Sequence, residues 1–178
     1  MVLQEGNADA IIESLQKRSF DVAIARYPMR AASGVVMRLI EKDRFCAALP
    51  LGHRLATLKQ IRLQALADET FLVPTASHNP ALHGLVIQAC QVAGFMPRLA
   101  QEEAVQLSTV LALVEGGFGV ALIPEGVARA VRRNVVFVRL SGTSASLETG
   151  LGLLHLEGPQ SPRVTLFRDA VLSLKPVR

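Results

Sequence analysis

The sequence is poor in aromatic residues, with no tryptophan, one tyrosine and seven phenylalanines among its 178 residues. Proteins that bind single-stranded nucleic acids do so largely by stacking bases on aromatic side chains, so this composition argues against such a surface. The net charge of +4 is also small, and its one basic cluster is Arg129, Arg132 and Arg133. Because cationic side chains are favourable in the last turn of a helix, we interpret this cluster as a helix end rather than a nucleic-acid interface.

Cysteine and long apolar runs are scarce as well. The only two cysteines, Cys46 and Cys90, lie in apolar stretches far apart in the sequence, without the spacing of a metal site. This pattern predicts two buried free thiols in a reducing compartment. The N-terminal residues have no basic start followed by an apolar run, and no stretch has the length of a membrane span. We therefore expect a cytoplasmic protein with no signal peptide and no membrane partner.

Motifs of catalysis and cofactor binding are absent too. The sequence contains neither a Gly-x-Ser-x-Gly turn nor a His-Glu-x-x-His pair. Two histidines, His78 and His83, are five residues apart, which puts them on different faces of a helix and argues against a shared metal. Gly117 and Gly119 begin a dinucleotide-like pattern, but Leu122 stands where its third glycine belongs. We expect no catalytic residue, no metal and no cofactor, and hence no enzyme.

What the sequence does have is a regular alternation of apolar patterns, with half of its residues hydrophobic. Apolar residues at Leu107, Val110 and Val114 recur at helical spacing, and Gly116 or Gly117 then supplies the residue that ends the helix. The apolar run that follows, 119–123, has the length of a buried strand. This helix–glycine–strand unit predicts an α/β arrangement.

The same alternation continues along most of the chain. Helices are predicted from about residue 9, over 63–66, 80–93 and 125–133, and from residue 162 onward. Strands are predicted at 20–25, 35–40, 45–49, 71–73, 98–100, 135–140 and 150–156, with a polar turn at 41–43. Such alternation implies α/β layers around largely parallel sheets. Polar crossing points near 52 and 141–146 divide the chain into one lobe of residues 1–52 and 145–178 and a second of 53–144, with a ligand cleft between them.

One group of residues suggests ligand binding. Asn79 can cap the helix that begins at Pro80, which leaves the next two backbone N–H groups at the positive end of the helix dipole, a suitable site for a carboxylate or phosphate. The candidate site comprises Thr75, Ser77, Asn79, Pro80, Ala81 and Leu82. An ordinary capped helix without a ligand is the alternative. Arg26 could meet the same anion across the cleft or could be a surface arginine.

Several segments in order resemble the effector-binding domain of LysR-type transcriptional regulators. The clearest are Leu49-Pro-Leu-Gly-His-Arg-Leu-Ala56, Ala93-Gly-Phe-Met-Pro97 and Val114-Glu-Gly-Gly-Phe-Gly-Val-Ala-Leu-Ile-Pro124. The resemblance implies a periplasmic-binding-protein-like fold of type 2, with two Rossmann-like lobes around a small, anionic effector such as an organic acid. By position it places effector contacts at Asn7, Ala8 and Arg26 and in the segment 77–82.

The resemblance also implies partners and missing parts. Relatives carry a winged helix-turn-helix domain before this region, so DNA would be bound only through that domain, by a homo-oligomeric protein. The first strand and helix of the first lobe are expected to be missing, which would expose a sheet edge. An effector would act by binding one arrangement of lobes or subunits more tightly than another. A solute-binding protein of a transport system is the alternative, and an enzyme on the same scaffold is a third possibility.

Overall fold

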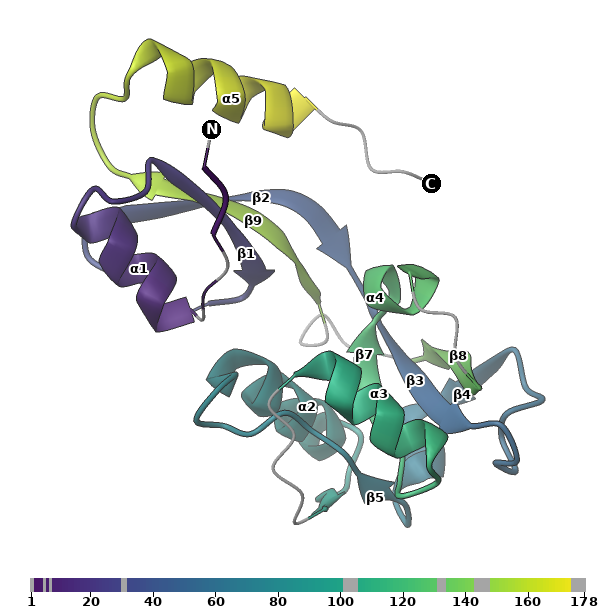
Figure 1. The fold of residues 1–178 in the computed structure, drawn as a ribbon. Helices are drawn as coiled ribbons and strands as arrows, with labels where there is room; N and C mark the ends of the chain where they lie inside the picture. The colour runs from purple at the N-terminus through teal and green to yellow at the C-terminus, as the bar shows by residue number, and fades with distance from the viewer. Residues whose placement is uncertain are drawn as a thin grey trace. The chain divides into compact units, whose positions relative to one another are not determined.

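A computed structural model describes residues 2–4, 6, 8–29, 32–100, 106–130, 134–142 and 148–173. The chain divides into two compact units (Figure 1). Unit 1 is Met1–Lys42 with Thr149–Arg178, and unit 2 is Asp43–Glu148. The first crossing therefore lies ten residues before the boundary expected at residue 52, because the strand that follows it belongs to the sheet of unit 2.

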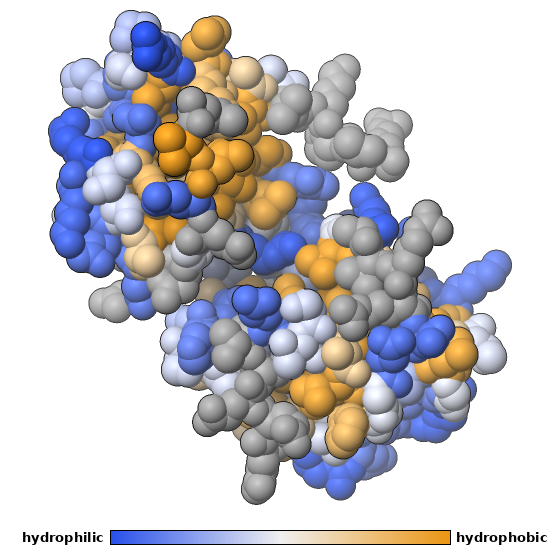
Figure 2. Space-filling view, in the orientation of Figure 1, coloured by the Kyte–Doolittle hydropathy of each residue, from blue (hydrophilic) through white to orange (hydrophobic). Residues whose placement is uncertain are grey.

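Unit 1 is a three-stranded sheet in the order β1-β9-β2, with β1 at Val22–Tyr27, β9 at Thr149–Leu156 and β2 at Val35–Asp43. The helix α1 (Ala8–Gln16) packs on β1 and β9, and α5 (Pro162–Ser173) follows β9 (Figure 1). Leu15 of α1 faces inward and is fully buried. Hydrophobic side chains gather on the face of this unit shown in Figure 2.

Unit 2 is built on a four-stranded sheet in the order β4-β8-β3-β7. These strands are β4 (Gln60–Arg62), β8 (Val135–Ser141), β3 (Phe45–Pro50) and β7 (Ala121–Pro124). The remaining elements are the 3₁₀ helix η1 (Leu63–Leu66), the short strands β5 (Thr70–Phe71) and β6 (Arg98–Leu99), and the helices α2 (Pro80–Val92), α3 (Leu107–Glu115) and α4 (Glu125–Ala130).

The apolar run of β3 is explained by burial on both faces. Successive side chains of a strand point to opposite sides of the sheet, and β3 uses both sides. Phe45, Ala47 and Leu49 belong to one core cluster with the buried face of α2. Cys46 and Ala48 belong to the other cluster, with the buried face of α3. The two helices therefore cover opposite faces of the same strand.

Most predicted elements are confirmed, often to within two residues. The opening helix begins at Ala8, the helix expected at 80–93 is α2, and the helix ahead of the glycine pair is α3. Of the two candidate glycines, Gly117 is the left-handed residue, with φ of +79°, whereas Gly116 stays right-handed at −73°. The helix predicted at 125–133 is described as far as Ala130, and 131–133 lie outside the described residues.

The expectation of largely parallel sheets is wrong. The β1–β9, β3–β7 and β3–β8 pairs are antiparallel, while β4–β8 and β5–β6 are parallel. The cause is the double crossing: the chain leaves unit 1 along β2 and returns to it along β9, so β9 runs against the direction of its neighbour. The alternation of apolar patterns does not encode the direction of a strand.

The polar turn predicted at 41–43 is also wrong, because these residues continue β2. The strand runs to Asp43, and only Arg44 separates it from β3. A side chain at Gly150 would collide with the carbonyl oxygen of Glu41, so β9 and β2 lie in close backbone contact there. Pairing with β9 keeps this polar stretch extended. Within the described residues, no helix is long and apolar enough to cross a membrane.

Candidate functional site

The N-terminus of α2 has the capped geometry that the sequence predicts. Asn79 is the N-cap, its Oδ1 accepts a hydrogen bond from the Leu82 N–H at 3.1 Å, and Pro80 occupies the first helical position. One expectation is corrected by this contact. The Leu82 N–H is used within the cap, and the Leu82 side chain is 4% exposed in the core, so neither group is directed at a ligand.

The amide of Ala81 remains at this helix end. Among the described residues, none accepts a hydrogen bond from the Ala81 N–H. Pro80 has no N–H, and Asn79 satisfies that of Leu82, so Ala81 presents the one amide of the first turn open to an external acceptor. A helix of 13 residues adds the positive end of its dipole at the same point.

The loop before α2 brings two hydroxyls and an imidazole together. His78 Nδ1 lies 3.0 Å from Thr75 Oγ1 and 3.1 Å from Ser77 Oγ, and the Ser77 hydroxyl donates to Thr75 Oγ1 at 3.3 Å. The loop is closed by the backbone N–H groups of His78 and Asn79, which both donate to the Thr75 carbonyl. The sequence indicated Thr75 and Ser77 as site residues, whereas His78 was considered only as a metal ligand and set aside. Its position one helical turn after Thr75 was the available signal.

His83 makes a hydrogen bond outside this group of side chains. Its Nδ1 lies 3.0 Å from the carbonyl oxygen of Pro74, and since a carbonyl can only accept, Nδ1 is the donor. The ring thereby ties the first turn of α2 to the segment before the loop. Across the described residues there is no group of three or more His, Cys, Asp or Glu side chains that could hold a metal ion.

The remaining predicted contacts belong to unit 1. Arg26 lies on β1 opposite Leu151 of β9 and is half-buried, and Ala8 is the exposed first residue of α1. Asn7 lies outside the described residues. The structure thus gathers Thr75, Ser77, Asn79, Pro80, Ala81 and Leu82 at one helix end in unit 2, while Ala8 and Arg26 are part of the other unit.

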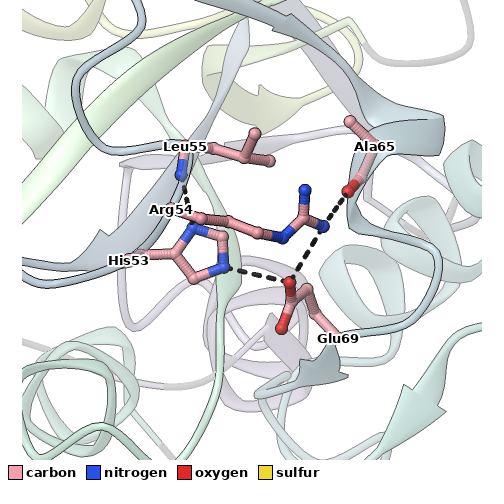
Figure 3. Close-up of polar contacts among 5 residues, drawn as sticks. All are labelled: His53, Arg54, Leu55, Ala65 and Glu69. Carbon is pink, nitrogen blue, oxygen red and sulfur yellow. Dashed lines mark hydrogen bonds and ion pairs between the residues drawn. The ribbon is translucent and has the colours of Figure 1, made fainter.

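A second polar cluster in unit 2 was not predicted as such (Figure 3). Glu69 Oε1 lies 3.1 Å from His53 Nε2 and 3.2 Å from Arg54 Nη2, and the Arg54 guanidinium also donates to the Ala65 carbonyl at 2.8 Å. The Leu55 N–H donates to His53 Nδ1, so the ring proton is on Nε2, the nitrogen that lies 3.1 Å from Glu69 Oε1. The cluster joins the turn after β3 to η1 and to the residue that precedes β5, which indicates a structural role for the Gly-His-Arg-Leu motif.

The two thiols are buried and free, as predicted. Burial raises the pKa of Cys46 to about 12, with smaller contributions from the negative charges of Glu125 and Asp43. Burial alone raises the pKa of Cys90 to about 12. A thiol with so high a pKa is protonated at neutral pH, so neither cysteine has the reactivity of a nucleophile.

Comparison with known proteins identifies the class. The family described as "LysR substrate binding domain" matches residues 1–175. The transcriptional regulator BudR of Raoultella terrigena is 26% identical over 165 residues, which cover 93% of this chain and 56% of that protein. Two solved structures share the fold: the crystal structure of CbnR, a LysR family transcriptional regulator, with a TM-score of 0.83 at 19% identity, and the effector-binding domain of QuiR in complex with shikimate, with a TM-score of 0.77 at 20% identity.

The chain therefore belongs to the LysR substrate-binding domain family. The alignment with CbnR covers 96% of this chain and 57% of the CbnR chain. The alignment with the QuiR domain covers 94% of this chain and 77% of that domain. The chain spans about half the length of the curated relatives it matches. The type 2 periplasmic-binding-protein-like fold expected from the sequence is confirmed.

Proposed function

We propose that this chain is the effector-sensing part of a LysR-type transcriptional regulator and that the N-terminus of α2 binds a small anionic effector, such as an organic acid. The observation that carries the proposal is the open Ala81 N–H beside the Thr75 and Ser77 hydroxyls, at the positive end of α2. The Ala81 N–H can donate to a carboxylate, which accepts several hydrogen bonds at once, and the Thr75 and Ser77 hydroxyls can donate to it when they rotate away from their contacts within the loop. The relative QuiR was solved with shikimate, itself a carboxylic acid.

We further propose that Arg26 supplies a second contact to the same effector from the other unit. A guanidinium is always charged and fits a carboxylate in a two-bonded geometry. In this proposal, units 1 and 2 correspond to the two lobes of the family. An effector held by both favours one arrangement of the lobes, and its differential affinity sets how far the equilibrium shifts.

The rest of the regulator is proposed from the relatives. DNA binding is assigned to a winged helix-turn-helix domain outside these residues, in a homo-oligomeric, cytoplasmic protein whose role is sensing rather than catalysis. A transport solute-binding protein, the alternative, is not favoured, because the curated relatives are transcriptional regulators.

Binding of organic acids tests the site. Thermal-shift screening of a panel of small carboxylates selects a ligand, and calorimetry then gives its affinity for the wild type and for Ser77→Ala, Thr75→Ala and Arg26→Gln. Loss of a hydrogen bond to a charged group costs about 1.5–3 kcal/mol, so affinity is expected to fall about 10- to 100-fold.

Ser108→Ala is the matched control, because Ser108 is also a hydroxyl at the start of a helix, where it donates to Gln106 Oε1. Its affinity should equal that of the wild type. Unchanged binding in the Ser77, Thr75 and Arg26 variants, with intact unfolding curves, would remove this site from the proposal. Binding by the full-length regulator to its DNA, with and without the selected acid, tests the regulatory role.

A further inference from the structure

The chain passes from unit 1 to unit 2 along β2 and β3, which are separated only by Arg44. A hinge is ordinarily expected at a break between two strands, because residues within a strand are held by hydrogen bonds to neighbouring strands. The contacts around Arg44 contradict that placement. One of its peptide groups is bonded to α4 directly, and the other is bonded to the Asp43 carboxylate, which itself contacts α4.

Asp43 makes the first of these ties. Its carboxylate accepts the Arg44 N–H at 2.8 Å and the Gly126 N–H of α4 at 3.1 and 3.3 Å. The second tie comes from the other side of Arg44, whose carbonyl accepts the Glu125 N–H at 2.8 Å. Three backbone N–H groups, two of them at the start of α4, are thus satisfied by Asp43 and Arg44.

The Asp43 carboxylate packs closely against the backbone of Gly126. A Cβ at Gly126 would lie 2.9 Å from Asp43 Oδ2, closer than a side chain tolerates, so the absence of a side chain there allows the carboxylate to reach the helix. On the unit 1 side, β2 is in close contact with β9 at Glu41 and Gly150. The return crossing is tied to unit 1 by the Thr149 hydroxyl, which donates to the Tyr27 carbonyl at 2.6 Å.

From these contacts we infer that Asp43 is a positioning residue that fixes Arg44 and the start of β3 to unit 2, so that rotation between the units takes place on the unit 1 side of Asp43. Without the carboxylate, Arg44 joins the hinge and the range of inter-unit arrangements widens. An effector that binds one arrangement of the units most tightly must then shift the equilibrium away from a larger number of other arrangements. The inference concerns the crossing alone and does not require the effector proposed above.

Spin-label distances measure the range of arrangements directly. Leu166→Cys on α5, at a side chain 74% exposed, and Gln88→Cys on the exposed side of α2 place one label in each unit. The native thiols are buried and stay unlabelled. Asp43→Ala should widen the inter-label distance distribution about twofold, because two further backbone torsions become free. Asp43→Asn retains an acceptor oxygen and should keep the wild-type width.

Asp68→Ala is the matched control, since Asp68 is an exposed aspartate of the same unit that makes no hydrogen bond or ion pair through its side chain among the described residues. An Asp43→Ala width equal to that of the wild type, or an equal widening in Asp68→Ala, would overturn the inference. If Asp43→Ala does not fold, Gly126→Ala provides the test, because its methyl group displaces the carboxylate. It should widen the distribution and speed hydrogen exchange of the Arg44 amide, and failure to do both rejects the inference.

Discussion

Asn79 and Leu82 are joined by a hydrogen bond of 3.1 Å from the Leu82 N–H to the Asn79 side chain, and this bond starts α2. Replacing Asn79 by Ala removes the cap and should lower the free energy of unfolding by about 1 kcal/mol. Urea denaturation measures the change. Asn79→Asp retains the acceptor and should unfold at nearly the wild-type urea concentration, so an equal loss in both variants would show that the cap is not the cause.

Two glycines of unit 2 should respond oppositely to alanine. A Cβ at Gly119 would collide with the Thr70 carbonyl oxygen and approach Leu72 at 3.3 Å, whereas one at Gly84, within α2, meets no atom within 4 Å. Gly119→Ala is therefore expected to destabilise the protein by about 1–3 kcal/mol through overpacking. Gly84→Ala should stabilise it by about 0.5–1 kcal/mol, because alanine is the better helix former. Thermal unfolding of the two variants measures these changes in stability. A change of the same sign in both variants would contradict the structure.

The buried thiols predict a loss of stability in alkaline solution. Folding raises the pKa of Cys46 and of Cys90 from 9.0 to about 12, so between these values the unfolded chain gives up protons that the folded chain retains. Stability from these groups is complete below pH 9 and should fall as pH rises from 9 to 12, by at most about 1.4 kcal/mol per pH unit for each thiol.

A comparison of wild type with the Cys46→Ala, Cys90→Ala double variant isolates this effect, since other alkaline groups are common to both. Urea unfolding at a series of pH values should give a shallower decline for the variant. A thiol-reactive chromophore at pH 8 should label neither cysteine in the folded wild type and both in urea. Rapid labelling of the folded protein would refute their burial.

In the His53–Glu69–Arg54 cluster, truncation of Glu69 should destabilise the protein more than truncation of Arg54. Glu69→Ala removes a carboxylate that lies within 3.2 Å of both His53 Nε2 and Arg54 Nη2, in a site where the His53 side chain is 11% exposed, and should cost about 1–2 kcal/mol. The Arg54 side chain is 58% exposed, and its removal leaves the His53–Glu69 contact in place, so Arg54→Ala should cost under about 1 kcal/mol. Chemical denaturation measures the free energy of unfolding of the two variants. A larger loss for Arg54→Ala than for Glu69→Ala would contradict this prediction.

Local features were the most accessible to sequence reasoning. Asn79 and Pro80 predicted the start of α2 because capping chemistry involves only neighbouring residues, and the spacing of Val110, Leu111 and Val114 predicted the buried face of α3 for the same reason. The family motifs predicted the fold, because they sit at turns and helix ends whose order is particular to it.

Features that depend on distant partners were missed. Polar residues at Glu41 and Lys42 indicated a turn, yet pairing with β9, more than a hundred residues later, keeps them in β2. The candidate site was predicted in part. The cap by Asn79 was expected, but which amide it uses and how His78 Nδ1 contacts the two hydroxyls depend on the path of the loop.

The division of the chain also bears on its synthesis. Unit 2 is one continuous stretch, Asp43–Glu148, whereas the sheet of unit 1 needs β9, which begins at Thr149. Chains fold from the N-terminus as the ribosome extends them, at about 5–20 residues per second. Unit 2 of the nascent chain can therefore become native first, while β1 and β2 stay without their central partner until β9 is translated.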